Sequence, residues 1–209
     1  MPDDPQLSLF DAAAPVATRL PEGMRYEPEF LEIDEERALI GCIRTLPLEA
    51  AKYKGYTARR RVASFGGSFD YDTNRLLPSA ELVEELHPLR DRVAQWLGVV
   101  AADLVHVLVA EYAPGTPLGW HRDVPDFEDV VGVSLGGQAT MRFRPYPPLQ
   151  PKRADVVRLT LEPRSIYALR GEARWNWQHS VAPTKGLRWS VTFRTARRAR
   201  VTAGASRVV

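Results

Sequence analysis

Cysteine is nearly absent from this sequence, since Cys42 is the only one among its 209 residues. A single thiol excludes a disulfide within the chain and a metal site built from several thiolates. Such sparse use of cysteine is typical of a reducing compartment, so we expect a cytoplasmic location.

Long apolar runs are missing as well. Stretches such as Leu104–Ala110 are far too short to cross a bilayer, and the first residues lack the basic-then-apolar layout of a signal peptide. Neither sign of charge dominates, because 28 Lys and Arg stand against 26 Asp and Glu. The sequence predicts no membrane segment, and a net charge of +2 is too weak to establish a nucleic-acid partner by itself.

The remaining composition is that of an ordinary globular chain, with 44% hydrophobic and 26% charged residues. We divide it into a tail over residues 1–20, one domain over 21–200 and a C-terminal tail over 201–209. No feature of the sequence indicates the oligomeric state, and we take a monomer as the default.

Helical patterns come first in the domain. Asp34 is placed to cap a helix that Pro47 ends, and a second helix is expected from Ser79 to Gly98, with Pro88 able to kink it. The strands predicted after it are Leu104–Tyr112, Val130–Leu135, Thr140–Arg144, Val156–Leu161, Ser165–Leu169 and Leu187–Arg194. This order predicts an α+β fold whose core is a double-stranded β-helix (jelly roll) supported by N-terminal helices, because that closure limits exposed strand edges.

A candidate metal site begins with His121 and Asp123, an H-x-D pair in an extended segment. Alternate residues of such a segment point to the same face, so both side chains converge. His87 belongs to a charged helix and His106 to an apolar strand, which leaves His179 as the best third ligand. Two histidines and one carboxylate form the facial triad of non-haem Fe(II) oxygenases, although catalytic zinc uses similar sets. An H-x-D pair alone is a weak signal, and its alternative interpretation is a polar loop.

Two arginines follow the third histidine. Arg188 and Arg194 lie six residues apart in a predicted strand, so both project from the same side. Arginine binds carboxylates through a planar fork, as a dicarboxylate requires. Two exposed arginines on an amphipathic strand are the alternative, but the ordered set of H-x-D, His and R-x5-R is far more specific.

This ordered set resembles that of the AlkB family of Fe(II)- and 2-oxoglutarate-dependent dioxygenases. The segments Tyr112–Gly115 and Gly171–Arg174 also match the family, and the resemblance covers roughly residues 53–194. It implies that His121, Asp123 and His179 bind Fe(II), and that Arg188 contributes to catalysis by holding the cosubstrate.

The resemblance further implies that 2-oxoglutarate is bound by Tyr112, Arg188 and Arg194. One position departs from the family, which often has asparagine where Ala110 stands. One hydrogen bond to the cosubstrate is then missing or is supplied elsewhere, and Ser190 is a candidate.

AlkB-like enzymes oxidise N-methyl groups of nucleobases and release formaldehyde. Residues 57–67 resemble the nucleotide-recognition lid of the family, with a solvated basic loop as the alternative. The expected substrate contacts are phosphates at Arg59, Arg60 and Arg61, stacking at Phe65 or Tyr71, and further contacts at Trp120 and Arg122. Trp175 and Trp177 are also candidates, although large aromatic side chains more often belong to a core.

A short motif stands in the N-terminal tail. The segment Gln6–Phe10 resembles the pentapeptide by which bacterial repair and replication proteins bind the sliding clamp of DNA polymerase. Gln6 would hydrogen-bond in a small pocket, while Leu7, Leu9 and Phe10 would fill apolar clefts. The alternative is that these residues fold back on the domain. The motif favours DNA over RNA as the nucleic-acid partner.

Three functions therefore compete. The leading prediction is oxidative demethylation of N-alkylated nucleobases, namely repair of DNA carrying 1-methyladenine- or 3-methylcytosine-type lesions. The first alternative is a hydroxylase or demethylase of the same class that acts on tRNA or protein. The second is a DNA-binding module without catalysis, which the intact ligand and arginine set argues against.

Overall fold

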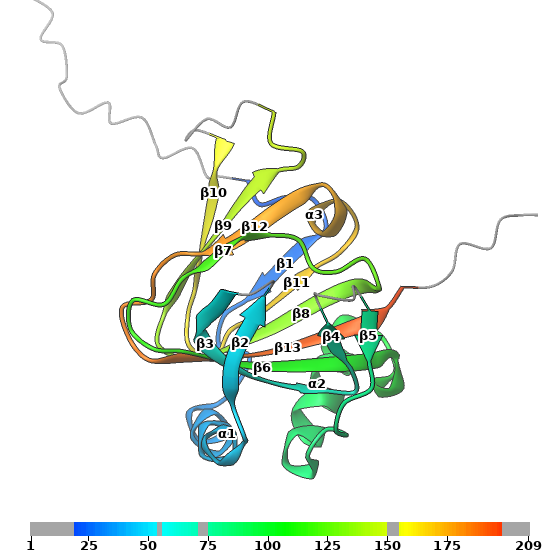
Figure 1. The fold of residues 1–209 in the computed structure, drawn as a ribbon, viewed down its shortest axis with the longest axis vertical. Helices are drawn as coiled ribbons and strands as arrows, with labels where there is room; N and C mark the ends of the chain where they lie inside the picture. Colours follow the sequence, from blue (N-terminus) through cyan, green and yellow to red (C-terminus); the bar gives the residue numbers. More distant parts are fainter. Residues whose placement is uncertain (1–18, 54–55, 71–74, 150–154, 198–209) are drawn as a thin grey trace, which may run out of the picture.

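The structure is a computed structural model that describes residues 19–53, 56–70, 75–149 and 155–197. Strands dominate the domain (Figure 1). The strands are β1 Met24–Glu27, β2 Glu49–Tyr53, β3 Tyr56–Phe65, β4 Ser68–Asp70, β5 Arg75–Leu77, β6 Leu104–Tyr112, β7 Leu118–His121, β8 Phe127–Gly136, β9 Ala139–Pro145, β10 Val157–Leu161, β11 Ile166–Leu169, β12 Trp177–Val181 and β13 Arg188–Ala196. The helices are α1 Ile33–Thr45, α2 His87–Leu97 and α3 Gly171–Trp175, with 3-10 turns at Glu84–Leu86 and Ala101–Asp103.

Two antiparallel sheets face each other. The large sheet has seven strands in the order β1-β11-β8-β13-β6-β3-β2, and the small sheet has four in the order β10-β9-β12-β7. Strands β4 and β5 form a separate pair. Helices α1 and α2 lie against the side of the large sheet that faces away from the small one (Figure 1). This is the α+β jelly roll that the sequence predicts.

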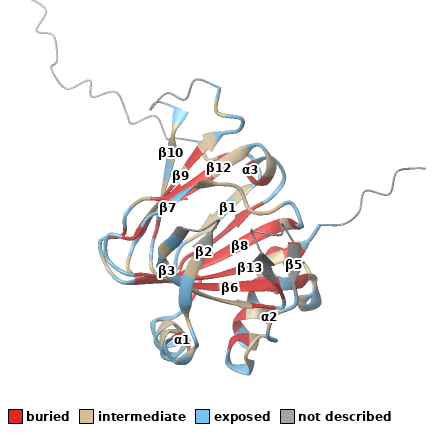
Figure 2. Ribbon diagram, in the orientation of Figure 1, coloured by how far each residue is buried: buried red, intermediate tan, exposed pale blue. Residues whose placement is uncertain are grey.

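The central strands β8, β13 and β6 of the large sheet are buried on both faces, as the buried residues along them show (Figure 2). On the helix side, Ile43 and Val93 pack with Val107 and Val191 in one core cluster. Between the sheets, Phe143 and neighbouring side chains form a second cluster. Alternation along β13 places Trp189, Val191 and Phe193 in the helix-side core, so the intervening residues, including both arginines, point toward the small sheet.

The helix boundaries differ from the prediction at their starts. Helix α1 begins after Glu32, which forms a capping box with Glu35, whereas Asp34 lies in the first turn and pairs with Arg37. Helix α2 begins at His87 rather than near Ser79, because residues 78–83 form no helix and a 3-10 turn precedes it.

The other helix and strand predictions fare better. Pro88 sits in the first turn of α2, where its missing N–H is harmless, and Gly98 ends the helix in the left-handed conformation with φ 79°. All six predicted strands are present, and Leu104–Tyr112 has the predicted bounds. The strands β2, β3 and β7 were not predicted as such, and they carry or border the site. No helix in the described ranges is long and apolar enough to cross a membrane.

Candidate metal centre and cosubstrate pocket

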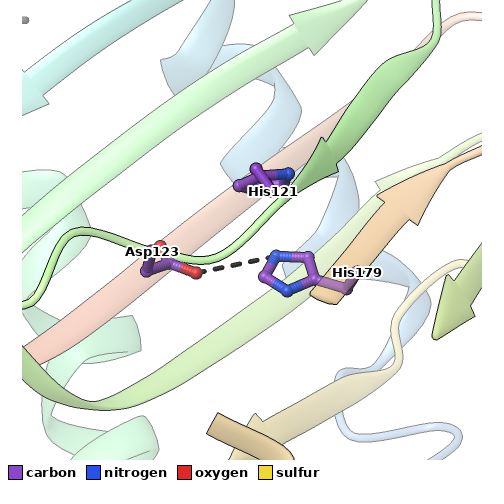
Figure 3. A group of neighbouring side chains, drawn as sticks. All are labelled: His121, Asp123 and His179. Atoms are coloured by element: carbon purple, nitrogen blue, oxygen red, sulfur yellow. Dashed lines mark ion pairs between the residues drawn. The ribbon is translucent and has the colours of Figure 1, made fainter. Parts of the chain in front are cut away.

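Three predicted ligands meet at the end of the small sheet. His121 ends β7, Asp123 follows two residues later, and His179 lies in β12 directly opposite His121 in the antiparallel register. Their candidate ligand atoms all lie within 4.8 Å of one another. Figure 3 shows the two rings and the carboxylate converging, with His179 Nε2 at 3.6 Å from Asp123 Oδ2.

The orientation of these side chains fits a metal ion. The backbone carbonyl of Gly119 lies 2.9 Å from His121 Nδ1, so that nitrogen donates and Nε2 keeps its lone pair for a ligand. Asp123 Oδ2 is buried and has no hydrogen-bond partner among the described residues. A buried carboxylate oxygen needs a compensating partner, and a cation between the two imidazoles supplies one.

The protonation states also suit a metal. Burial is the main cause that lowers the pKa of His121, and it lowers the pKa of His179 to about 3. Burial by itself would raise the pKa of Asp123, but Arg194 and the two histidines outweigh it and hold that pKa well below its usual range. Neutral imidazoles and an ionised carboxylate are the forms that bind a metal.

Arg194 holds the ligand Asp123 in place. Its Nε and Nη2 atoms lie 2.8 Å and 2.6 Å from Asp123 Oδ1, and its Nη1 donates to His106 Nδ1 at 3.0 Å. Burial lowers the pKa of His106 to about 3, so this ring is a neutral acceptor. His106 is thus the satisfied, buried histidine that the sequence suggests.

A second arginine fixes the loop that follows the metal ligand. Arg174 of α3 is buried, and its Nη2 donates to the carbonyls of Asp123, Val124 and Phe127 at 3.2, 2.8 and 2.9 Å. In the sequence, the segment that ends at Arg174 is recognisable only by its resemblance to the family. That Arg174 positions the ligand loop can be seen only once the three carbonyls that it meets are known.

Arg188 has a different environment from Arg194. It is only 2% exposed, and its Nε donates to Ser134 Oγ at 3.2 Å. The ring of Tyr112 lies 5.1 Å from its guanidinium carbon, and the described residues offer it no ion pair. A buried cation without a carboxylate partner fits the carboxylate of a dicarboxylate cosubstrate. Ser190 lies directly opposite Ala110 in the register, so its hydroxyl belongs to the same wall.

The site opens into a cavity of about 1440 Å³ between the sheets. Five of the predicted substrate residues line it, namely Arg59, Arg60, Phe65, Trp120 and Arg122. Arg60 Nε is buried without a hydrogen-bond partner among the described residues.

The other predicted contacts have different surroundings. Arg61 forms an ion pair with Glu111 at 2.8 Å and does not line the cavity. Phe65 borders the cavity, but it is only 5% exposed and packs in the helix-side core, so little of its ring is open to a base. Trp175 and Trp177 are absent from the cavity wall. Tyr71 lies outside the described residues.

Tyr167 is a wall residue that the sequence analysis missed. It lies in β11 opposite Gly132 of β8, and a Cβ atom at Gly132 would come within 2.4 Å of its ring. Burial is the main cause that raises the pKa of Tyr167 above its usual value. Only the register of the two strands reveals that this glycine makes room for the ring.

Comparisons with known proteins agree with this site. The family described as "2OG-Fe(II) oxygenase superfamily" matches residues 23–202. The chain is 28% identical over 173 residues to the tRNA (carboxymethyluridine(34)-5-O)-methyltransferase alkbh8 of Xenopus tropicalis, covering 79% of this chain and 26% of that protein. It is 30% identical over 182 residues to the alkylated DNA repair protein ALKBH8 homolog of Arabidopsis thaliana, covering 76% and 50%. The chain therefore spans half or less of these relatives.

Solved structures share the fold. The structure titled "The structure of OsALKBH1" superposes with a TM-score of 0.65 at 16% identity, covering 85% of this chain and all (100%) of that one. A prolyl-4-hydroxylase of Pseudomonas putida superposes with a TM-score of 0.58 at 17% identity, covering 85% and 94%. At these identities the likeness is one of fold.

Fold, ligand set and family match together define the class as Fe(II)- and 2-oxoglutarate-dependent dioxygenases. The chain belongs to the 2OG-Fe(II) oxygenase superfamily, and the relatives named above are ALKBH8 proteins, which carry the AlkB name. The resemblance predicted from the ligand and arginine motifs is confirmed.

Proposed function

We propose that this enzyme oxidatively demethylates N-alkylated nucleobases in nucleic acid, with 1-methyladenine- and 3-methylcytosine-type lesions in DNA as substrates. The cavity carries the proposal. Its volume of about 1440 Å³ exceeds the roughly 300–1,000 Å³ of ordinary small-molecule sites. It therefore has room for a flipped-out base beside the cosubstrate, and methylation that breaks base pairing makes flipping easier.

The reaction converts an N–CH₃ group, O₂ and 2-oxoglutarate into N–H, formaldehyde, succinate and CO₂. Bound Fe(II) supplies the activation of O₂ that this oxidation requires. His121, Asp123 and His179 hold the metal, and Arg188 with Tyr112 orients the cosubstrate carboxylate.

Arg60 is the phosphate contact that the geometry favours. Its Nε atom is buried without a partner among the described residues, whereas Arg61 is occupied by Glu111. A guanidinium on the cavity wall without an ion pair is available to a phosphate next to the target base. We expect Arg60→Gln to raise KM for an oligonucleotide by roughly 10-fold, and Arg61→Gln to change it much less. Equal effects of the two substitutions would contradict this assignment.

The proposed function is tested with DNA and RNA oligonucleotides that carry 1-methyladenine or 3-methylcytosine, followed by mass spectrometry. Loss of the methyl group from DNA is the expected result. Persistence of every adduct while 2-oxoglutarate is consumed would refute base demethylation.

A second candidate is modification of tRNA, since the Xenopus tropicalis relative is named for a tRNA carboxymethyluridine enzyme. The same alternative includes a hydroxylase or demethylase that acts on protein. Turnover of tRNA or RNA adducts with none of DNA would favour the tRNA function. The basic cavity wall serves either nucleic acid, so the substrate panel makes the distinction.

The DNA proposal includes a partner, the sliding clamp of DNA polymerase. The segment Gln6–Phe10 that would bind it lies outside the described residues. We expect that deleting residues 1–11 abolishes clamp binding and spares demethylation of free oligonucleotides. Clamp binding that survives the deletion would refute this part. We also propose that the protein acts as a monomer in the cytoplasm, which sedimentation and fractionation test.

A further inference from the structure

We propose that the outer face of the small sheet binds the single-stranded nucleic acid that flanks the target nucleotide. This inference rests on the proposed function, because it names where the rest of that substrate lies. The surface centres on three arginines and two aromatic rings, which we call the arginine–aromatic cluster. Its members are Trp120, Arg122, Arg142, Arg144 and Tyr146.

The strand register shows why the central members point outward. His179 pairs with His121 of β7 and Phe143 of β9, and these side chains face the metal site and the core. Residues one position away along each strand point to the opposite face. Trp120 and the β9 arginines therefore share the outer face of the small sheet.

The β9 arginines reach across β12 toward Trp120. Arg142 Nε donates to Ser180 Oγ at 3.0 Å, and Arg144 Nε donates to Gln178 Oε1 at 2.8 Å. These β12 side chains fix the direction of both guanidinium groups.

Each ring of the cluster lies near a cation. The guanidinium carbons of Arg144 and Arg142 lie 4.5 Å and 5.3 Å from the centre of the Trp120 ring. Arg122 stacks 3.6 Å from the centre of the Tyr146 ring, which is 39% exposed. Trp120 also lines the cavity and directly precedes the ligand His121. The cluster therefore starts at the mouth of the site and continues away from it.

The charged side chains that the strands of this sheet contribute are all basic. None of the strands β7, β9, β10 and β12 contains Asp or Glu, while β9 and β10 together contribute Arg142, Arg144 and Arg158. Within the described ranges, neither Arg142 nor Arg144 forms an ion pair, in contrast to Arg37 and Arg61. Cations for phosphates beside rings for bases are the combination that single-stranded nucleic acids require. An acidic protein would need the charges alone.

The test measures how the full chain binds an unmodified, labelled DNA strand of about 12 nucleotides by fluorescence anisotropy at several salt concentrations. We expect the double variant Arg142→Gln/Arg144→Gln to bind on the order of 10-fold more weakly near 0.1 M salt. Its log–log salt slope should be shallower by about 1.4, because each lost phosphate contact on a single strand removes about 0.7. The matched control Arg37→Gln/Arg90→Gln, on the helices beyond the large sheet, should bind like the wild type.

A second variant separates stacking from charge. Trp120→Ala should weaken binding and leave the salt slope unchanged, because it removes a ring and no cation. If Trp120→Ala binds normally and polyglutamate competes as well as the oligonucleotide, the surface fits an acidic protein and the proposal is overturned.

The proposal is also overturned if the folded double variant binds the strand as tightly as the wild type does, or if the wild type does not bind the strand. If thermal unfolding shows that the double variant is unfolded, the single substitutions Arg142→Gln and Arg144→Gln should each give about half of the slope change, and unchanged slopes count against the proposal. Binding of an unmodified strand needs no demethylation. If no adduct is removed yet the variants lose binding, the proposed function fails and the surface proposal stands.

Discussion

Replacing Arg188 by methionine should stabilise the cosubstrate-free protein while it destroys cosubstrate binding. The guanidinium is 2% exposed, with one hydrogen bond to Ser134 and the described residues offering no ion pair. Replacing a buried ion pair by apolar side chains of similar size is often neutral or stabilising by about 1–4 kcal/mol, and a buried cation without a counter-ion has still less to offset its desolvation. The lost hydrogen bond costs about 1 kcal/mol, so we expect a net gain of up to about 3 kcal/mol. This corresponds to a rise in Tm of up to roughly 12 °C.

Arg194→Met is the matched control, and its effect should have the opposite sign. Arg194 and Asp123 form an ion pair whose side chains are only 11% and 5% exposed. Removing one member leaves a buried carboxylate without its cation, which costs about 3–5 kcal/mol. The cosubstrate-free protein should therefore lose roughly 6–20 °C in Tm. Two arginines six residues apart in one strand would thus change stability in opposite directions.

Thermal unfolding with and without Fe(II) and 2-oxoglutarate checks both variants. At about 100-fold excess over Kd the cosubstrate should stabilise the wild type by about 2.7 kcal/mol. Arg188→Met should lose this shift, and its KM for 2-oxoglutarate should rise roughly 100-fold or more. A destabilised Arg188→Met protein with an unchanged KM would refute the assignment of Arg188 as the cosubstrate anchor.

Three further predictions concern the site. Gly132→Ala should lower Tm by roughly 2–10 °C, because its Cβ would overlap the buried Tyr167 ring. The control Gly41→Ala, on an open helix face, should not lower Tm. An unchanged Tm in Gly132→Ala would contradict the close contact. Arg174→Met should destabilise the protein by about 2–4 kcal/mol in urea unfolding and weaken Fe(II) binding, since three carbonyls of the ligand loop lose their donor. A normal Fe(II) affinity would show that Arg174 does not position the ligand Asp123. His179→Ala should abolish the 2-oxoglutarate-dependent absorption band on anaerobic Fe(II) addition, and a retained band would exclude it as a ligand.

Much of the site was predictable because its signals are local. The H-x-D pair places His121 and Asp123 on one face by the alternation of extended chain alone. The same alternation puts Arg188 and Arg194 on one side of β13. Strand β6 had the predicted bounds because an apolar run there is closed by Pro and Gly.

Two predicted substrate contacts have surroundings that the local pattern did not reveal. Phe65 looked like an aromatic residue of a basic loop, yet it lies in β3, which adds to the large sheet beside β6. Arg61 looked equivalent to Arg60, but the pairing of Arg61 with Glu111 across β3 and β6 occupies it. Both outcomes depend on a partner in β6 that lies more than forty positions away in the chain, which no local window contains.

The sequence by itself determined the chemistry: which side chains can bind iron, which can bind a dicarboxylate, and which of them share a face of a strand. The tertiary structure alone decided how those faces are used. It placed Arg194 against Asp123 and left Arg188 buried without a carboxylate, although both occupy equivalent positions in one strand. The physical reason is that alternation fixes the direction of a side chain, whereas its partner is set by the register of strands brought together over long separations in the chain.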